Sequence, residues 1–439
     1  MAFLVASRRD GYAYRRLPFF TNLELSLGPH PSDEVVWYLA ETLYSIRLQA
    51  TYFTSLDLSY ANRLLSPHLP LAFVIASLTT LKRIFLEGFG RNCGSMIRRM
   101  QSALLDVKLF REGKNCREGI EFPLLHPDND PILLLQPFHL TLQSFRTDLP
   151  IHALHGLRYL NMTTLNLGNI EKPAVSIYVA AFPNLLRLAI SFRTTDVLHP
   201  SGESDNRRLS IAQQVQYDTW RSLDKVEGEL DDLYMLGLTC PVNEVEIVGI
   251  FMPYPFSCSP EDTAQAHMIR ELMMCARPRR VVLSFVGTAW LVDTWNFEFL
   301  CEETALQSLE SLEFRVIVGE PHEDAEHMED FLTCVDIVLS SLGPARFSLT
   351  LDWSQAEPQM DVESGLLVTP WDELRDLALD EHVSCFLRSS RQASEMHLVG
   401  PDGWRRDVVH YSMAPRSSGS EIPVASASSE GASLAGASA

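Results

Sequence analysis

Residues 157–170 read LRYLNMTTLNLGNI, and apolar residues lie three, two and three positions apart at Met162, Leu165, Leu167 and Ile170. The apolar face of a helix repeats every three or four residues, and a strand with one buried face repeats every two. The stretch mixes these intervals, so neither element fits its whole length. The mixture indicates a short strand with further apolar residues before and after it.

The same spacing recurs along the chain. Its core consists of three apolar residues. Two residues of any type separate the first from the second, and one separates the second from the third. The pattern recurs around Leu56, Ile84, Leu188, Val245 and Leu312, in weaker form around Val281 and Phe347, and as bare strand alternation at Leu23/Leu25/Leu27, Val107/Leu109 and Met396/Leu398.

Several of the intervals between these matches lie between 23 and 35 residues. They are 23 residues from Leu165 to Leu188 and 35 residues from Leu312 to Phe347. The interval from Leu188 to Val245 is 57 residues, which a degenerate turn near Trp220, Leu223 and Val226 would divide. Periods of about 20–35 residues with a short strand in each are typical of leucine-rich repeats.

Helical patterns separate the strands. Apolar residues share one face in 33–46 (Val36, Leu39, Leu43), in 94–105 (Ile97, Met100, Leu104, with Ser95 as the expected N-cap) and in 327–342 (Met328, Phe331, Val335, Val338). Alternating strands and helices imply a parallel sheet. The sequence therefore predicts an irregular α/β leucine-rich-repeat solenoid, a curved parallel sheet with helices on its outer face. A generic α/β protein with similar strand starts is the alternative.

Residues between the inward leucines are expected to face the concave side of such a sheet. On the opening stretch these are Thr164, Asn166 and Gly168. Exposed charged and aromatic residues on an extended sheet are suited to binding a protein. The predicted protein-binding positions are Asp57, Arg83, Phe85, Glu87, Lys108, Arg187, Glu246, Glu313 and Arg315.

The chain divides into an N-terminal segment (1–17), the repeat domain (18–412) and a Ser/Ala/Gly-rich tail (413–439), which we expect to be disordered. Within the domain, 195–210 is polar and is expected to be a surface loop. The chain has 439 residues, more than a single compact core of about 300 residues takes up, so its length indicates either several domains or an elongated repeat fold.

The formal net charge of −20 disfavours binding to nucleic acid and to acidic membranes. The eight cysteines are scattered, without metal-binding pairs, which is typical of a reducing compartment. We identify no signal peptide and no apolar run long enough for a membrane helix. The expected location is therefore the cytoplasm or the nucleus.

Candidate chemistry is sparse. The turn Gly88–Gly94 has a GxGxxxG spacing between a strand and a helix, so the alternative function is a Rossmann-like nucleotide-binding enzyme. The pairs His322/Glu326 and Glu323/His327 have a metal-binding spacing, but they lie in an acidic helix start. Asp128 and Asp130 lack the rest of a calcium loop and are expected to lie in a turn, and Cys240 is expected to be a small buried residue. We predict no catalytic residue, cofactor or metal.

Two segments carry a family resemblance. The stretches WRSLDKVEGELDDLYMLGLTCPVNEVEI (220–247) and FPNLLRLAIS (182–191) resemble F-box/leucine-rich-repeat-like proteins of mushroom-forming fungi. The resemblance implies substrate recognition for Skp1-cullin ubiquitin ligases, in which an F-box binds the adaptor and the repeats bind a target. Residues 1–20 are too short to hold an F-box before the first strand at Leu23. We expect non-catalytic recognition of an unidentified protein, or a degenerate paralogue without retained function.

Overall fold

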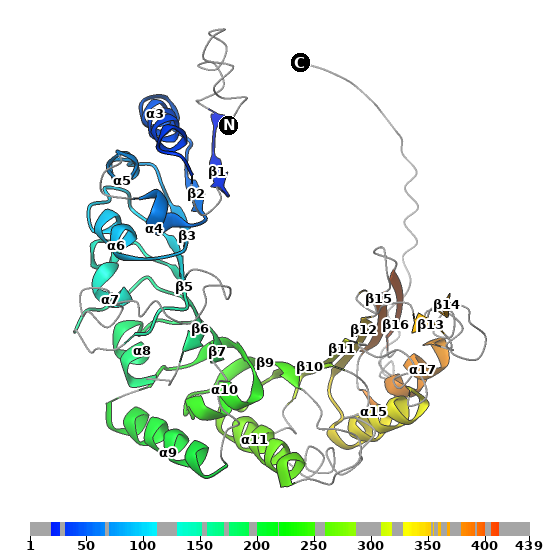
Figure 1. Ribbon diagram of the computed structural model, residues 1–439. Coiled ribbons are helices and arrows are strands. Elements are labelled where there is room, and N and C mark those ends of the chain that lie inside the picture. Colours follow the sequence, from blue (N-terminus) through cyan, green and yellow to red (C-terminus); the bar gives the residue numbers. More distant parts are fainter. Residues whose placement is uncertain are drawn as a thin grey trace, which may run out of the picture.

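A computed structural model shows a mixed α/β protein built on one long open sheet (Figure 1). The sheet has 14 strands in the order β1 to β12, then β15 and β16. The structure describes residues 19–26, 31–65, 70–111, 130–151, 156–170, 175–192, 200–217, 219–250, 260–286, 309–317, 328–352, 354, 359–360, 367–368, 379–390, 393–399 and 405–411. The N-terminal segment 1–17 and the tail 413–439 lie outside these residues.

The first half of the chain alternates short strands with helices, which are all short except the first. Its strands are β1 (Asn22–Leu25), β2 (Ser55–Leu58), β3 (Arg83–Glu87), β4 (Asp106–Phe110), β5 (Ser144–Thr147), β6 (Thr164–Ile170) and β7 (Arg187–Phe192). Its helices are α3 (Asp33–Gln49), α4 (Ala61–Leu64), α5 (Leu71–Ala76), α6 (Arg91–Ile97), α7 (Pro131–Leu134), the 3₁₀ helix η3 (Gln136–Phe138) and α8 (Val175–Ala181).

The second half continues the alternation with longer elements. Its strands are β8 (Leu223–Gly228), β9 (Val242–Ile250), β10 (Arg280–Val286), β11 (Ser311–Ile317), β12 (Arg346–Asp352), β15 (Ala393–Val399) and β16 (Arg405–Tyr411). Its helices are α9 (Pro200–Tyr217), α10 (Leu230–Leu236), α11 (Pro260–Ala276), α15 (Met328–Leu342) and α17 (Leu379–Ser389). Strands β13 (Gln359–Met360) and β14 (Leu367–Val368) form a separate antiparallel pair.

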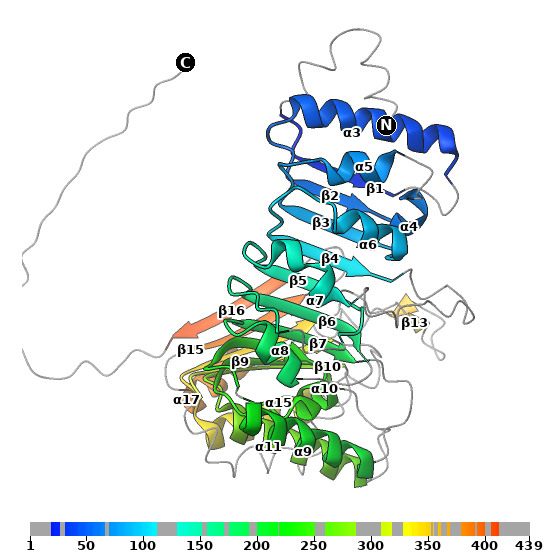
Figure 2. The ribbon, with the colours of Figure 1, turned by 90° about the vertical axis from the view of Figure 1, so that its left-hand side faces the viewer.

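The sheet curves, with strands on the inner side and helices on the outer side (Figures 1 and 2). Neighbouring strands pair in parallel from β1 to β15, as predicted from the alternation of strand and helix. Only the last sheet pair, β15 with β16, is antiparallel. The degenerate turn expected near Trp220 is also confirmed, because β8 lies between β7 and β9.

Register explains why the sheet extends so far. The central apolar residue of each repeat pairs with that of the next, as in Leu165 with Leu188, and Leu188 with Val226. These residues are buried. A single strand and helix could not bury such a row alone, so each repeat depends on its neighbours. In the opening stretch, Met162, Leu165 and Leu167 are fully buried, as predicted; the side chain of Ile170 lies outside the described part.

The helix containing Ser95 begins earlier than expected. The predicted N-cap at Ser95 is wrong, because α6 begins at Arg91 and Gly90 occupies the capping position. Gly90 is needed there, since a Cβ atom would lie 2.4 Å from Cγ of Asn62. The close approach of a neighbouring repeat therefore decides where this helix starts.

The predicted polar loop at 195–210 is also wrong over most of its length, since α9 begins at Pro200. The helix is polar in sequence, but Arg207 and Gln214 are buried against α10. Nε2 of Gln214 donates to the carbonyl oxygens of Leu236 (3.1 Å) and Gly237 (2.9 Å) at the end of α10. Polar residues thus stabilise this helix by contacts that helical periodicity cannot reveal.

Asp130 was expected to lie in a turn and instead caps a helix. Its Oδ1 atom accepts from the backbone N–H of Ile132 at 2.8 Å, at the start of α7. Asp128 lies outside the described residues.

Candidate functional site

The candidate site is the concave face of the sheet, where the predicted binding residues are carried by β2–β4, β7, β9 and β11. Alternate strand residues point to opposite faces, and one of the two sets is buried against the helices. Of the predicted residues, Arg83, Lys108 and Arg187 are exposed, whereas Asp57, Phe85, Glu87, Glu313 and Arg315 are partly buried. Glu246 was predicted to be exposed and is buried, with 6% of its surface accessible.

An aromatic and arginine stack occupies the first half of this face. The rings of Phe85 (β3) and Phe110 (β4) meet edge to face with centroids 5.5 Å apart. The guanidinium of Arg146 (β5) lies 5.3 Å from the centroid of Phe110. Sequence reasoning missed Phe110, which follows the inward Leu109 at the end of β4. It also missed Arg146, because the β5 sequence SFRT does not match the leucine pattern. Arg146 is paired in register with Lys108, so it lies on the same concave face as Lys108.

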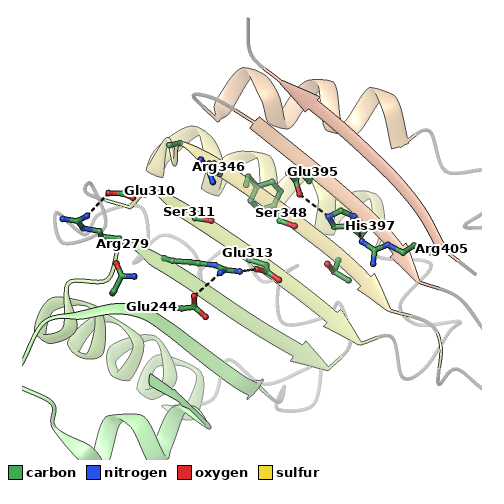
Figure 3. A pocket seen from close by; sticks show the side chains of 15 residues that line it. Glu244, Arg279, Glu310, Ser311, Glu313, Arg346, Ser348, Glu395, His397 and Arg405 are labelled. Atoms are coloured by element: carbon green, nitrogen blue, oxygen red, sulfur yellow. Dashed lines mark hydrogen bonds and ion pairs between the residues drawn. The ribbon is translucent and has the colours of Figure 1, made fainter. Parts of the chain in front are cut away.

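The second half of the face carries a network of ion pairs, which we call the charge ladder. It consists of Lys225, Glu227, Glu244, Glu246, Arg280, Glu313 and Arg315, on β8 to β11. Arg280 contacts Glu244 at 3.0 Å and Glu313 at 2.6 Å. Figure 3 marks these contacts with dashed lines to Glu244 on β9 and Glu313 on β11, the two strands on either side of β10.

One rung of the charge ladder passes over an intervening strand. Arg315 on β11 donates to Glu246 on β9 at 2.5 Å, and β10 lies between these strands. Val282 of β10 is paired in register with both Glu246 and Glu313 and is fully buried, although it points to the concave side. The long arginine side chains therefore exclude water from an apolar residue while keeping their charged ends accessible.

The ladder changes the protonation behaviour of its members. Burial by itself would raise the pKa of Glu313, but hydrogen bonds from Arg280 and Arg315 outweigh it and the pKa is lowered. The pKa of Lys225 is raised, because its hydrogen bond and attraction to Glu246 outweigh the opposing effect of burial. Glu313 and Lys225 are therefore held in their charged forms at neutral pH.

The lowered pKa of Glu313 predicts an acid-sensitive contribution to stability. In the unfolded chain its pKa takes the ordinary value of 4.5, so the contribution is complete above pH 4.5. It is lost as the pH falls below 4.5 and through the folded pKa. We expect Glu313→Gln to destabilise the protein by about 1–2 kcal/mol at neutral pH, because two charged donors lose their anionic acceptor.

The measurement is urea unfolding of both proteins between neutral pH and pH 3. The difference in free energy of unfolding should shrink below pH 4.5. Glu310→Gln is the control, since its contact with Arg279 (3.6 Å) is largely exposed and should contribute little at any pH. A difference between Glu313→Gln and the native protein that is constant with pH would contradict the assignment.

An open pocket of about 810 Å³ adjoins the ladder over β9 to β16 (Figure 3). Ser311, Ser348 and Thr350 line it between taller charged side chains. On its far side, Nδ1 of His397 lies 2.7 Å from Asp407, which Arg405 also contacts at 2.6 Å. Most cations of the pocket are thus already paired with carboxylates.

The turn Gly88–Gly94, where the alternative hypothesis places a nucleotide, is packed against Asn62. Asn62 Oδ1 accepts from the backbone N–H of Asn92 at 2.9 Å, and Asn92 Nδ2 donates to the Asn62 carbonyl at 2.9 Å. Gly88 (φ +76°) and Gly90 are buried against Asn62 and its neighbours. Strand order is also sequential, without the reversal that creates the nucleotide crevice of a doubly wound sheet.

The sequence also suggested a candidate metal site and drew attention to one cysteine. No group of three His, Cys, Asp or Glu side chains there is placed to hold a metal ion, and 319–327, with His322, Glu323, Glu326 and His327, is not among the described residues. Cys240 is buried, as predicted, and burial raises the pKa of its thiol to about 11. No helix of the described part is both long and apolar enough to cross a membrane.

Comparison with known proteins adds no family. No family model matches the chain, and no curated protein matches it.

Proposed function

We propose that this chain is a leucine-rich-repeat solenoid that recognises another protein through its concave face, without catalysis. The stack of Phe85, Phe110 and Arg146 on that face is the observation that carries the proposal. Aromatic and arginine side chains are the residues that most often dominate binding energy at protein interfaces. Here they are partly exposed on strands, which hold them more rigidly than loops would.

The shape of the sheet supports the same function. A curved sheet of many short repeats presents an extended inner surface, which repeat proteins use to bind partners along several repeats. The charge ladder fixes the side chains of β8 to β11 before any partner arrives, so less conformational entropy is lost on binding. We further propose an intracellular setting and a relation to target recognition by Skp1-cullin ubiquitin ligases, which rests on the sequence resemblance alone.

Site-specific photo-crosslinking tests the proposal. A photo-reactive amino acid would be placed at Asn166 or Ser348 on the concave face, and at Arg91 on the outer helix α6 as the control. The tagged chain would be irradiated in its own cells and the adducts identified by mass spectrometry. We expect a reproducible adduct from the concave positions that is absent from the control.

The outcomes separate the possible roles. An adduct only from Arg91, or none from any position, would contradict recognition by the concave face and favour a paralogue without retained function. Skp1 and cullin recovered together with the concave adduct would support a role in a ubiquitin ligase. A single other partner would favour an adaptor.

A further inference from the structure

Cations lie directly opposite one another at two places on the concave face. Lys108 on β4 pairs in register with Arg146 on β5, and Arg187 on β7 pairs with Lys225 on β8. Lys108, Arg146 and Arg187 are all exposed. Neighbouring strands are about 4.8 Å apart, and like charges directly opposite each other are destabilising. Such pairs therefore need a source of negative charge.

Of these four cations, only Lys225 forms ion pairs with carboxylates among the described residues. Lys225 contacts Glu227 (3.3 Å), Glu244 (3.4 Å) and Glu246 in the charge ladder. No ion pair with a described carboxylate engages Lys108, Arg146 or Arg187. Arg146 stacks on Phe110 instead, which leaves its hydrogen-bond donors available.

Small side chains separate the unpaired cations. Thr164 and Asn166 of β6 and Ala189 of β7 occupy the concave positions between Arg146 and Arg187, and all three are partly exposed. Two strand spacings put β5 and β7 roughly 10 Å apart, enough for one extended peptide backbone. We call Lys108, Arg146 and Arg187, with the small residues between them, the cationic strip.

Nearby carboxylates offset the charge of the strip only in part. Asp57 on β2 attracts Lys108 electrostatically but forms no ion pair with it. The side chain of Asp106 on β4 has its Oδ1 atom buried without a hydrogen-bond partner and is two residues from Lys108. Asp148 accepts from the backbone N–H of Arg111 at 2.8 Å, beyond the end of β5. The strip thus holds three accessible cations on a chain whose net charge is −20.

We propose that the cationic strip binds an extended, Asp/Glu-rich segment of the protein partner. This inference rests on the proposed function and specifies the chemistry of the partner. Carboxylates spaced along one segment could pair with Arg146 from one side and Arg187 from the other. A nucleic acid is the poorer ligand, because phosphate binding needs many cations and the rest of this chain is strongly acidic.

Peptide selection on the full chain tests the inference. A phage-displayed library of random peptides would be selected on the native protein and on the triple variant Lys108→Glu, Arg146→Glu, Arg187→Glu. We expect Asp and Glu to be enriched in peptides that bind the native protein. The triple variant should lose these peptides and select Lys and Arg instead, because the sign of the strip is reversed.

A matched charge control uses exposed arginines on the outer side of the sheet. The variant Arg47→Glu, Arg91→Glu, Arg99→Glu changes the net charge by the same amount on α3, on α6 and in the turn after α6, and it should select the same acidic peptides as the native protein. Circular dichroism would show that both triple variants remain folded. For a selected peptide, fluorescence anisotropy should show binding about fivefold weaker for each strip cation changed to alanine.

Each remaining outcome is informative. One outcome is that the selected peptides show no enrichment in Asp and Glu while a photo-reactive residue at Asn166 still blocks their binding. That result would overturn the inference but would still support recognition by the concave face. If both triple variants lose binding to the acidic peptides equally, that binding depends on the net charge of the chain and not on the cationic strip. This result would also overturn the inference. If a single-stranded oligonucleotide binds more tightly than the acidic peptides, the partner of the strip is a nucleic acid and not an acidic protein segment, and the inference is overturned. No selected peptide at all, together with no crosslink at Asn166, would contradict both proposals.

Discussion

Replacement of Trp220 by alanine is expected to lower the free energy of unfolding by about 3–5 kcal/mol. Among the described residues, Trp220 is the largest fully buried side chain, and it lies just before β8, where the leucine pattern is most degenerate. Its Nε1 atom donates to the carbonyl oxygen of Phe182 at 2.9 Å, which links this repeat to the preceding one. The truncation would therefore remove packing and leave a buried carbonyl unsatisfied.

Trp220→Phe separates the two contributions. Phenylalanine keeps much of the apolar volume but cannot donate, so a smaller loss of about 1–3 kcal/mol is expected. Urea unfolding followed by circular dichroism provides the measurement. A loss below 1 kcal/mol for Trp220→Ala would show that the repeat before β8 does not join its neighbours as the structure indicates.

Arg207→Ala is expected to destabilise the protein by about 2–4 kcal/mol. The guanidinium of Arg207 lies 4.3 Å from the ring centroid of Tyr234 and donates to the Tyr234 carbonyl oxygen at 2.8 Å. It also contacts Glu271 of α11 at 3.4 Å. One buried side chain of α9 therefore joins three consecutive helices, so its loss should affect all of them.

Two further variants identify the interaction responsible. Arg207→Lys keeps the charge but not the planar group that stacks on Tyr234, so it should recover less than half of the lost stability. In a double-mutant cycle with Tyr234→Leu, we expect a coupling energy of about 1–2 kcal/mol. Hydrogen exchange should show faster opening of α9 and α10 in Arg207→Ala; unchanged protection of both helices would contradict the proposed linkage.

Strand positions were the most predictable part of the fold. Leu165, Leu188 and Val245 each occupy the inward position that the leucine spacing assigned to them. A strand residue faces either the helices or the solvent, so one buried face leaves a clear periodic signal. Even the degenerate turn near Trp220 could be placed, because the repeat period required a strand between Leu188 and Val245.

Helices in the polar part of the chain were less predictable. The segment containing Arg207 resembles a loop in composition, and its helix is stabilised by Tyr234 and Glu271 from helices that follow it in the chain. Likewise, the start of α6 depends on the contact between Gly90 and Asn62. Sequence signals for helix ends report local capping and cannot report a neighbouring repeat.

The sequence alone determined which strand residues face inward, because the leucine spacing repeats along the chain and one side of every strand must leave water. It also placed most concave positions, since they alternate with the leucines. Only the tertiary structure decided which concave charges meet. Glu246 and Arg315 are 69 positions apart yet form an ion pair across β10, whereas Lys108 and Arg146 face each other and neither forms an ion pair with a described carboxylate. Side-chain pairing between strands depends on register, and register is fixed by packing of the whole sheet.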